Sequence, residues 1–150
     1  SRSFCSRSIM APGQGDELTT AKKVLVVEDC SDVLELLQKG LALLGWNVAL
    51  ARSGREALNK LASDSPSVIL LDMRTSEMNG FELVRILKAH PVYGKIPILA
   101  AGGYYGHITR EQCLAAGFTD LIAKPFAFSE LETHLTDLLS AGRPKTIDAL

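Results

Sequence analysis

The stretch KVLVVED, at Lys23–Asp29, decides the fold, because an apolar run leads directly into two acidic residues. An uninterrupted run of this kind is typical of a strand that is covered on both faces in a parallel sheet. A second stretch, VILLDM at Val68–Met73, also ends its apolar run on an acidic residue. The two stretches therefore predict buried strands that carry charge at their carboxyl ends.

Further apolar segments alternate with segments of helical periodicity along the chain. The predicted strands are Val24–Val27, Trp46–Ala51, Val68–Leu71, Ile96–Ala101 and Leu121–Ala123. The predicted helix caps are Ser31, Ser53, the capping box of Thr109 with Gln112, and the capping box of Ser129 with Glu132. Strands that alternate with helices predict an α/β fold with a doubly wound, five-stranded parallel sheet.

Length and composition limit the domain organisation and the class of protein. The chain has 150 residues, of which 47% are hydrophobic and 22% charged, with a formal net charge of -1. We expect one domain at residues 22–140. Residues 1–21 would be a disordered tail, of which residues 1–9 would precede a native start at Met10, and residues 141–150 would be a C-terminal tail.

The same composition argues against several partners. The balanced charge disfavours a broad electrostatic nucleic-acid binder. No apolar run approaches the ~20 residues that cross a bilayer. Three widely spaced cysteines favour a reducing, cytoplasmic compartment.

Charged residues follow three of the predicted strands. Glu28 and Asp29 follow the first strand, Asp72 the third and Lys124 the fifth. If the strand order is 2-1-3-4-5, the three carboxylates meet in one crevice at the carboxyl edge of the sheet. Anions so close repel one another unless a cation joins them, and oxygen ligands suit Mg²⁺, with Mn²⁺ also compatible. We therefore predict a divalent cation, a phosphate-binding lysine and a carboxylate that could act as a nucleophile.

At these residues the chain resembles the receiver domains of two-component response regulators. The matching segments are KVLVVED at Lys23–Asp29, VILLDM at Val68–Met73, MNGFEL at Met78–Leu83 and KPF at Lys124–Phe126. The resemblance covers roughly residues 22–140 and implies a flavodoxin-like (βα)5 fold.

The resemblance implies a role for each charged residue. Asp72 would accept a phosphoryl group from a phosphohistidine on a sensor histidine kinase or a histidine phosphotransfer protein. The Mg²⁺ ligands would be Glu28, Asp29, Asp72 and the main-chain carbonyl of Arg74. Lys124 would contact the phosphoryl oxygens, and the bond that follows it, to Pro125, would be cis. Such a domain is not an enzyme beyond assisting its own phosphorylation and dephosphorylation. It regulates a downstream protein by contact, with no membrane and no direct nucleic-acid contact.

Two switch positions depart from the family pattern. Gly102 stands where a Thr or Ser is usual, and Leu121 where a Tyr or Phe is usual. A hydrogen bond to a charged group is worth ~1.5–3 kcal/mol, as much as a typical allosteric coupling of ~1–3 kcal/mol, so we expect a weakened switch. The missing hydroxyl could be replaced by backbone N–H groups of Gly102 and Gly103, or by a hydroxyl from Tyr104 or Tyr105. The alternative interpretation of Gly102 and Gly103 is a flexible loop with no role in binding phosphate.

Other positions leave alternatives open. Thr75 and Ser76 replace a common Met-Pro pair, and Arg74 would pair with the carboxylates, clasp the phosphoryl group or point to solvent. Cys30 is interpreted as an inert thiol and His134 as a surface or half-buried residue.

Three functions compete for this sequence. A phosphate-accepting receiver is favoured over a pseudo-receiver, a binding module without regulated phosphorylation. A haloacid-dehalogenase-type phosphohydrolase is disfavoured because Arg74 occupies the place of its second aspartate. The chain would be a stand-alone regulator or a fragment of a hybrid kinase, and its oligomeric state is left open.

Overall fold

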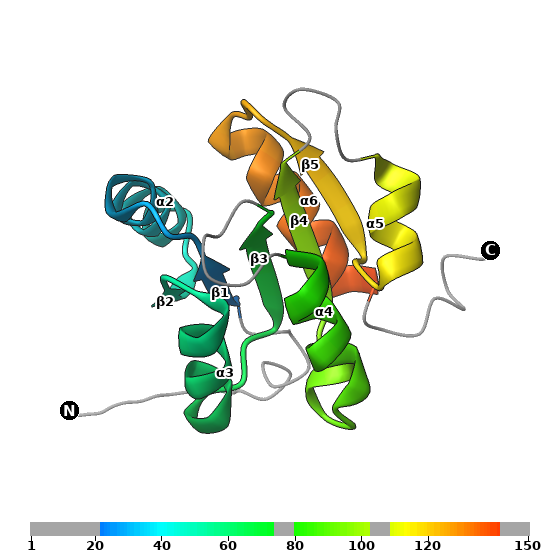
Figure 1. Cartoon of the computed structure of the whole chain (residues 1–150). Coiled ribbons are helices and arrows are strands. Elements are labelled where there is room, and N and C mark those ends of the chain that lie inside the picture. The colour runs from blue at the N-terminus through cyan, green and yellow to red at the C-terminus, as the bar shows by residue number, and fades with distance from the viewer. Residues whose placement is uncertain (1–21, 74–79, 103–108, 142–150) are drawn as a thin grey trace.

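The computed structural model describes residues 22–73, 80–102 and 109–141. Five parallel strands form one sheet in the order β2-β1-β3-β4-β5 (Figure 1). The strands are β1 Lys23–Val27, β2 Asn47–Ala51, β3 Val68–Asp72, β4 Ile98–Gly102 and β5 Asp120–Ala123. This order confirms the predicted doubly wound, flavodoxin-like sheet.

Helices connect the strands and cover both faces of the sheet. They are α2 Ser31–Leu43, α3 Gly54–Ser63, α4 Gly80–Ala89, α5 Arg110–Ala116 and α6 Phe128–Ala141, with a 3₁₀ turn, η1, at Tyr93–Lys95. Residues of α2 and α6 pack against one face, and residues of α3, α4 and α5 against the other. The central strands β1, β3 and β4 are therefore buried on both sides, which explains their unbroken apolar runs.

The strand register brings the carboxyl ends of the strands to one edge. Val27, the last residue of β1, pairs with Ala51 in β2 and with Leu71 in β3. Asp72 then pairs with Ala101 near the end of β4. Residues that end or directly follow β1, β3 and β5 consequently lie at the same edge of the sheet.

Local signals in the sequence set several helix boundaries as predicted. The Ser53 side chain accepts a hydrogen bond from the backbone N–H of Glu56 at the start of α3. Thr109 and Gln112 form the predicted capping box of α5. After α2, Gly45 has a φ of 93°, a left-handed conformation that glycine adopts without steric cost.

Two predicted caps are wrong. Cys30, not Ser31, is the N-cap of α2, and no side-chain hydrogen bond closes that end. Ser129 lies within α6, which begins at Phe128, so it does not form a capping box. The Glu132 carboxylate instead accepts hydrogen bonds from Lys22 Nζ at 3.3 Å and from the indole Nε1 of buried Trp46 at 3.4 Å. A buried indole N–H needs an acceptor, and that need outweighs a local cap.

Some predictions concern residues outside the described ranges. These are the tails at 1–21 and 142–150, the loop with Arg74, Thr75 and Ser76, and the loop with Gly103, Tyr104 and Tyr105. Among the helices that are described, none combines the length and the apolar character needed to cross a membrane.

Candidate functional site

Three elements place the charged side chains at the carboxyl edge of the sheet. Glu28 directly follows β1, and its backbone N–H still donates to Ala51 O at 2.9 Å. Asp72 is the last residue of β3, and Lys124 directly follows β5. Among the described residues, Glu28 and Asp72 are the two charged side chains that the core buries, each 5% exposed. Buried charge is costly unless it is paired, so both carboxylates need partners at this edge.

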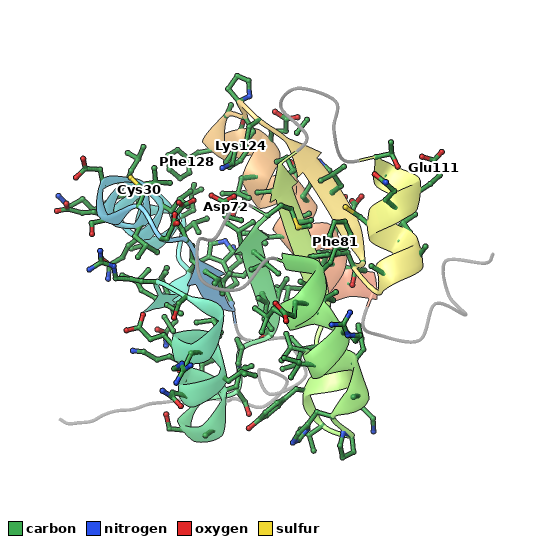
Figure 2. The ribbon with its side chains drawn as sticks, in the orientation of Figure 1. Cys30, Asp72, Phe81, Glu111, Lys124 and Phe128 are labelled. Atoms are coloured by element: carbon green, nitrogen blue, oxygen red, sulfur yellow. The ribbon has the colours of Figure 1, made fainter. Side chains whose placement is uncertain are left out.

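Lys124 and Asp72 form an ion pair across the end of the sheet. Lys124 Nζ donates to Asp72 Oδ2 at 3.0 Å, and only 6% of the Asp72 side chain is exposed against 27% for Lys124. Figure 2 shows both side chains at this edge, with Cys30 at the start of α2 on one side and Glu111 far off on α5. The lysine therefore neutralises one carboxylate oxygen and remains partly accessible to solvent.

Glu28 and Asp72 lie close enough to share a proton. Burial, followed by the hydrogen bond to Asp72 and the charge of Asp72, raises the pKa of Glu28 from 4.5 to about 8. The backbone N–H of Cys30, 3.1 Å from Glu28 Oε2, and the Lys124 ammonium oppose this shift without cancelling it. Glu28 therefore holds its proton to a higher pH than an ordinary glutamate, because two adjacent carboxylates do not both ionise readily.

The acidic residues fit a hard divalent cation by their donor chemistry. Within the described ranges, no three acidic, histidine or cysteine side chains stand close enough together to hold one metal ion as they are placed here. Glu28 and Asp72 nevertheless offer buried carboxylate oxygens, the donor type that a hard divalent cation prefers. Asp29, the next residue after Glu28, is partly exposed. The full ligand set stays a prediction, and the carbonyl of Arg74 lies outside the described residues.

A small cavity lies beneath this charged edge. It measures about 20 Å³, enough for about one water molecule, and Glu28, Asp72 and Lys124 line one part of it. The rest of its wall is apolar and includes Leu37 of α2 and Phe126, which follows Lys124 by two residues. Phe126 belongs to the KPF motif, and its position two residues after the lysine is the sequence signal that it borders the site.

The two switch positions, Gly102 and Leu121, lie in the last two strands of the sheet. Gly102 ends β4, is buried and offers no hydroxyl toward Asp72. Leu121 lies in β5, half-buried, and packs against the core that α3, α4 and α5 cover. The predicted cis peptide between Lys124 and Pro125 is confirmed.

The side chains of Cys30 and His134 have no described contact with the carboxylates or the lysine of the site. Cys30 is an exposed free thiol. His134 is half-buried, and its Nδ1 lies 3.1 Å from Asp120 Oδ2, away from the acidic edge.

A five-stranded sheet of this order, with an acidic pair and a lysine at its carboxyl edge, defines a class of α/β signalling domains. Residues 24–136 match the family described as the response regulator receiver domain. The chain belongs to this family, whose members are signalling domains of two-component systems rather than enzymes in the usual sense.

Curated relatives are about a third identical to the chain over the residues that align. The response regulator MprA of Mycolicibacterium vanbaalenii is 36% identical over 122 residues, which cover 81% of this chain and 52% of the relative. The transcriptional regulatory protein PrrA of Mycobacterium tuberculosis is 36% identical over 124 residues, which cover 83% of this chain and 52% of the relative. The chain thus spans about half the length of the curated relatives it matches.

Solved structures of receiver domains show the same fold. The receiver domain of the sensor histidine kinase PA1611 from Pseudomonas aeruginosa, with magnesium coordinated in its active-site cleft, is 29% identical with a TM-score of 0.73, over 81% of this chain and 99% of that one. A signal receiver domain of a histidine kinase from Syntrophus aciditrophicus is 31% identical with a TM-score of 0.72, over 81% of this chain and 92% of that one.

Proposed function

We propose that the chain is a phosphorelay receiver that takes a phosphoryl group on Asp72 and regulates a partner protein by contact. The donor would be a phosphohistidine on a sensor histidine kinase or a histidine phosphotransfer protein, in the cytoplasm. The observation that carries this proposal is the 3.0 Å ion pair between Lys124 and the buried Asp72, at the carboxyl edge of the sheet. Membership of the receiver family supports it.

In the proposed reaction, an Asp72 oxygen attacks the phosphorus of the donor. The new O–P bond forms as the N–P bond breaks, and the donor imidazole leaves with the electron pair. Phosphoryl transfer depends mainly on positioning and on neutralising the equatorial oxygens. Lys124 already contacts Asp72 Oδ2 and would contact a phosphoryl oxygen instead. Hydrolysis by water would then return the carboxylate and free phosphate.

Mg²⁺, or Mn²⁺ in its place, would be held by Glu28, Asp29, Asp72 and the main-chain carbonyl of Arg74. When bound, the ion would add positive charge against the phosphoryl oxygens. The PA1611 receiver domain coordinates magnesium in its active-site cleft, which supports this assignment by likeness. The proposed partners of this domain are proteins, with no direct nucleic-acid contact, although the relative PrrA is named a transcriptional regulatory protein.

The second candidate is a pseudo-receiver that binds a partner without regulated phosphorylation. One observation favours it: buried Gly102, at the end of β4, brings no hydroxyl to a phosphoryl group, and half-buried Leu121 brings none to report burial. The intact carboxylates and Lys124 weigh against it.

Acetyl phosphate labelling separates these functions. The protein is incubated with acetyl phosphate and Mg²⁺, and its intact mass is measured. We expect one added phosphoryl group on the wild type, none on Asp72→Asn, and one on the matched control Asp137→Asn, whose exposed aspartate lies on α6. An unchanged wild-type mass, under conditions that label another receiver domain, would contradict the proposal and favour the pseudo-receiver. Release of phosphate over many turnovers would indicate a phosphohydrolase.

A further inference from the structure

The Met73 side chain is enclosed between two glycines at the site. Met73 directly follows Asp72, is 6% exposed and belongs to the core that α3, α4 and α5 cover. Its backbone N–H donates to Ala101 O at 3.1 Å, so β4 fixes the main chain one residue beyond Asp72. Gly80 begins α4 and Gly102 ends β4, and both lie against this one side chain.

The contact with Gly80 involves the far end of Met73. A Cβ at position 80 would lie 2.6 Å from Met73 Sδ and 3.1 Å from Met73 Cε. No side chain can occupy that space while the thioether stays where it is. Because the thioether ends a flexible side chain, an alanine at position 80 would displace the tip of Met73 rather than the backbone.

The contact with Gly102 involves the near end of the same side chain. A Cβ at position 102 would lie 3.3 Å from both Cβ and Cγ of Met73. Met73 Cβ is fixed by the backbone and cannot rotate away. An alanine there would therefore push the Met73 main chain by a few tenths of an ångström, one residue from Asp72.

From these contacts we infer that Met73 is a positioning residue for Asp72. Its side chain ties the end of β3 to the start of α4 and to the end of β4, and so orients the Asp72 carboxylate toward Lys124. Gly102 has no side chain and so leaves the room that Met73 fills. The inference deepens the proposed function and rests on it only for the labelling readout.

Labelling rates with acetyl phosphate test the inference. A misplacement of about 1 Å costs roughly 10²-fold in rate, so a shift of a few tenths of an ångström should slow labelling of Gly102→Ala roughly fourfold. Met73→Ala should slow labelling by a similar factor, whereas Met73→Leu, which keeps the volume, should stay near the wild-type rate. The control Leu61→Ala removes a buried side chain of α3 from the same core and should lower stability without changing the labelling rate.

Double variants separate the two contacts. In a Met73→Ala background, Gly80→Ala should slow labelling no further, because the thioether it displaces is gone. Gly102→Ala should still slow labelling in that background, because the contact between the two Cβ atoms at 3.3 Å remains. Additive effects of Met73→Ala and Gly80→Ala, or a wild-type rate for Gly102→Ala, would overturn the positioning role.

A second measurement tests the positioning role of Met73 without phosphorylation, so its outcome does not depend on the proposed function. Backbone amide resonances of Asp72 and Lys124 are compared in wild type, Gly102→Ala and Leu61→Ala. We expect shifts at both residues in Gly102→Ala and none in Leu61→Ala. If the wild type is not labelled, the proposed function fails, and these resonances alone decide: unchanged shifts in Gly102→Ala would refute the positioning role.

Discussion

Glu28→Gln should change how the stability of the metal-free domain depends on pH. In the folded domain the pKa of Glu28 is raised from 4.5 to about 8, first by burial and then by Asp72. Below pH 4.5 both the folded and the unfolded chain hold the proton. Between pH 4.5 and about 8 the folded chain keeps a proton that the unfolded chain has lost, so rising pH favours unfolding. Above about 8 the full penalty is present.

The magnitude follows from the width of this pH window. The free energy of unfolding should fall by about 1.4 kcal/mol per pH unit while the proton difference is complete, or about 5 kcal/mol at most across the window. Gln in place of Glu28 keeps a carbonyl oxygen for the Cys30 N–H and offers an amide donor to Asp72. The variant should therefore lack this fall.

Urea unfolding at pH 5, 6, 7 and 8, with EDTA present, measures the effect. We expect the wild type to lose stability relative to Glu28→Gln as the pH rises, with most of the difference gained between pH 5 and 8. The comparison with the variant removes contributions from other titrating groups. Parallel stability profiles for the two proteins would refute the reasoning, because they would mean that Glu28 is ionised in the folded state at neutral pH.

Three further changes test interactions away from the site. Burial raises the pKa of Asp120, but hydrogen bonds from the Leu121 N–H, His134 and Arg110 outweigh it and leave that pKa below its usual value. Asp120→Asn should therefore lower the free energy of unfolding by about 1–2 kcal/mol at pH 7. Urea titrations should show a progressively smaller loss as the pH falls below 4. Glu132→Ala should cost about 1–3 kcal/mol in unfolding free energy because the Trp46 indole loses its acceptor, and Glu132→Gln should cost less; equal losses would contradict this. Thr109→Ala should lower thermal stability by about 1 kcal/mol through loss of the α5 cap, and an unchanged melting temperature would speak against it.

Much of the fold could be predicted because its signals are local. The unbroken apolar runs of β1 and β3 indicate strands that are buried on both faces, and Thr109 with Gln112 marks the start of α5 within four residues. The meeting of Glu28, Asp72 and Lys124 was also predictable, because parallel strands end at one edge and each residue stands at such an end.

Side-chain hydrogen bonds between residues far apart in the sequence could not be predicted. Glu132 has the spacing of a capping box with Ser129, yet its carboxylate pairs with Trp46, 86 residues away. His134 pairs with Asp120, which lies on a different element. Such pairs depend on which side chains the packing of α6 against the sheet brings within hydrogen-bond distance, and periodicity carries no information about that.

The amino-acid sequence by itself determined the alternation of strands and helices, the charged residues at the strand ends and the absence of a hydroxyl at Gly102, since each follows from residue type and position along the chain. Only the tertiary structure decided that burial beside Asp72 raises the pKa of Glu28 and that Met73 fills the space beside Gly80 and Gly102. Both depend on burial and on separations of a few ångströms between segments far apart in the sequence, and those distances exist only once the sheet and its helices have packed.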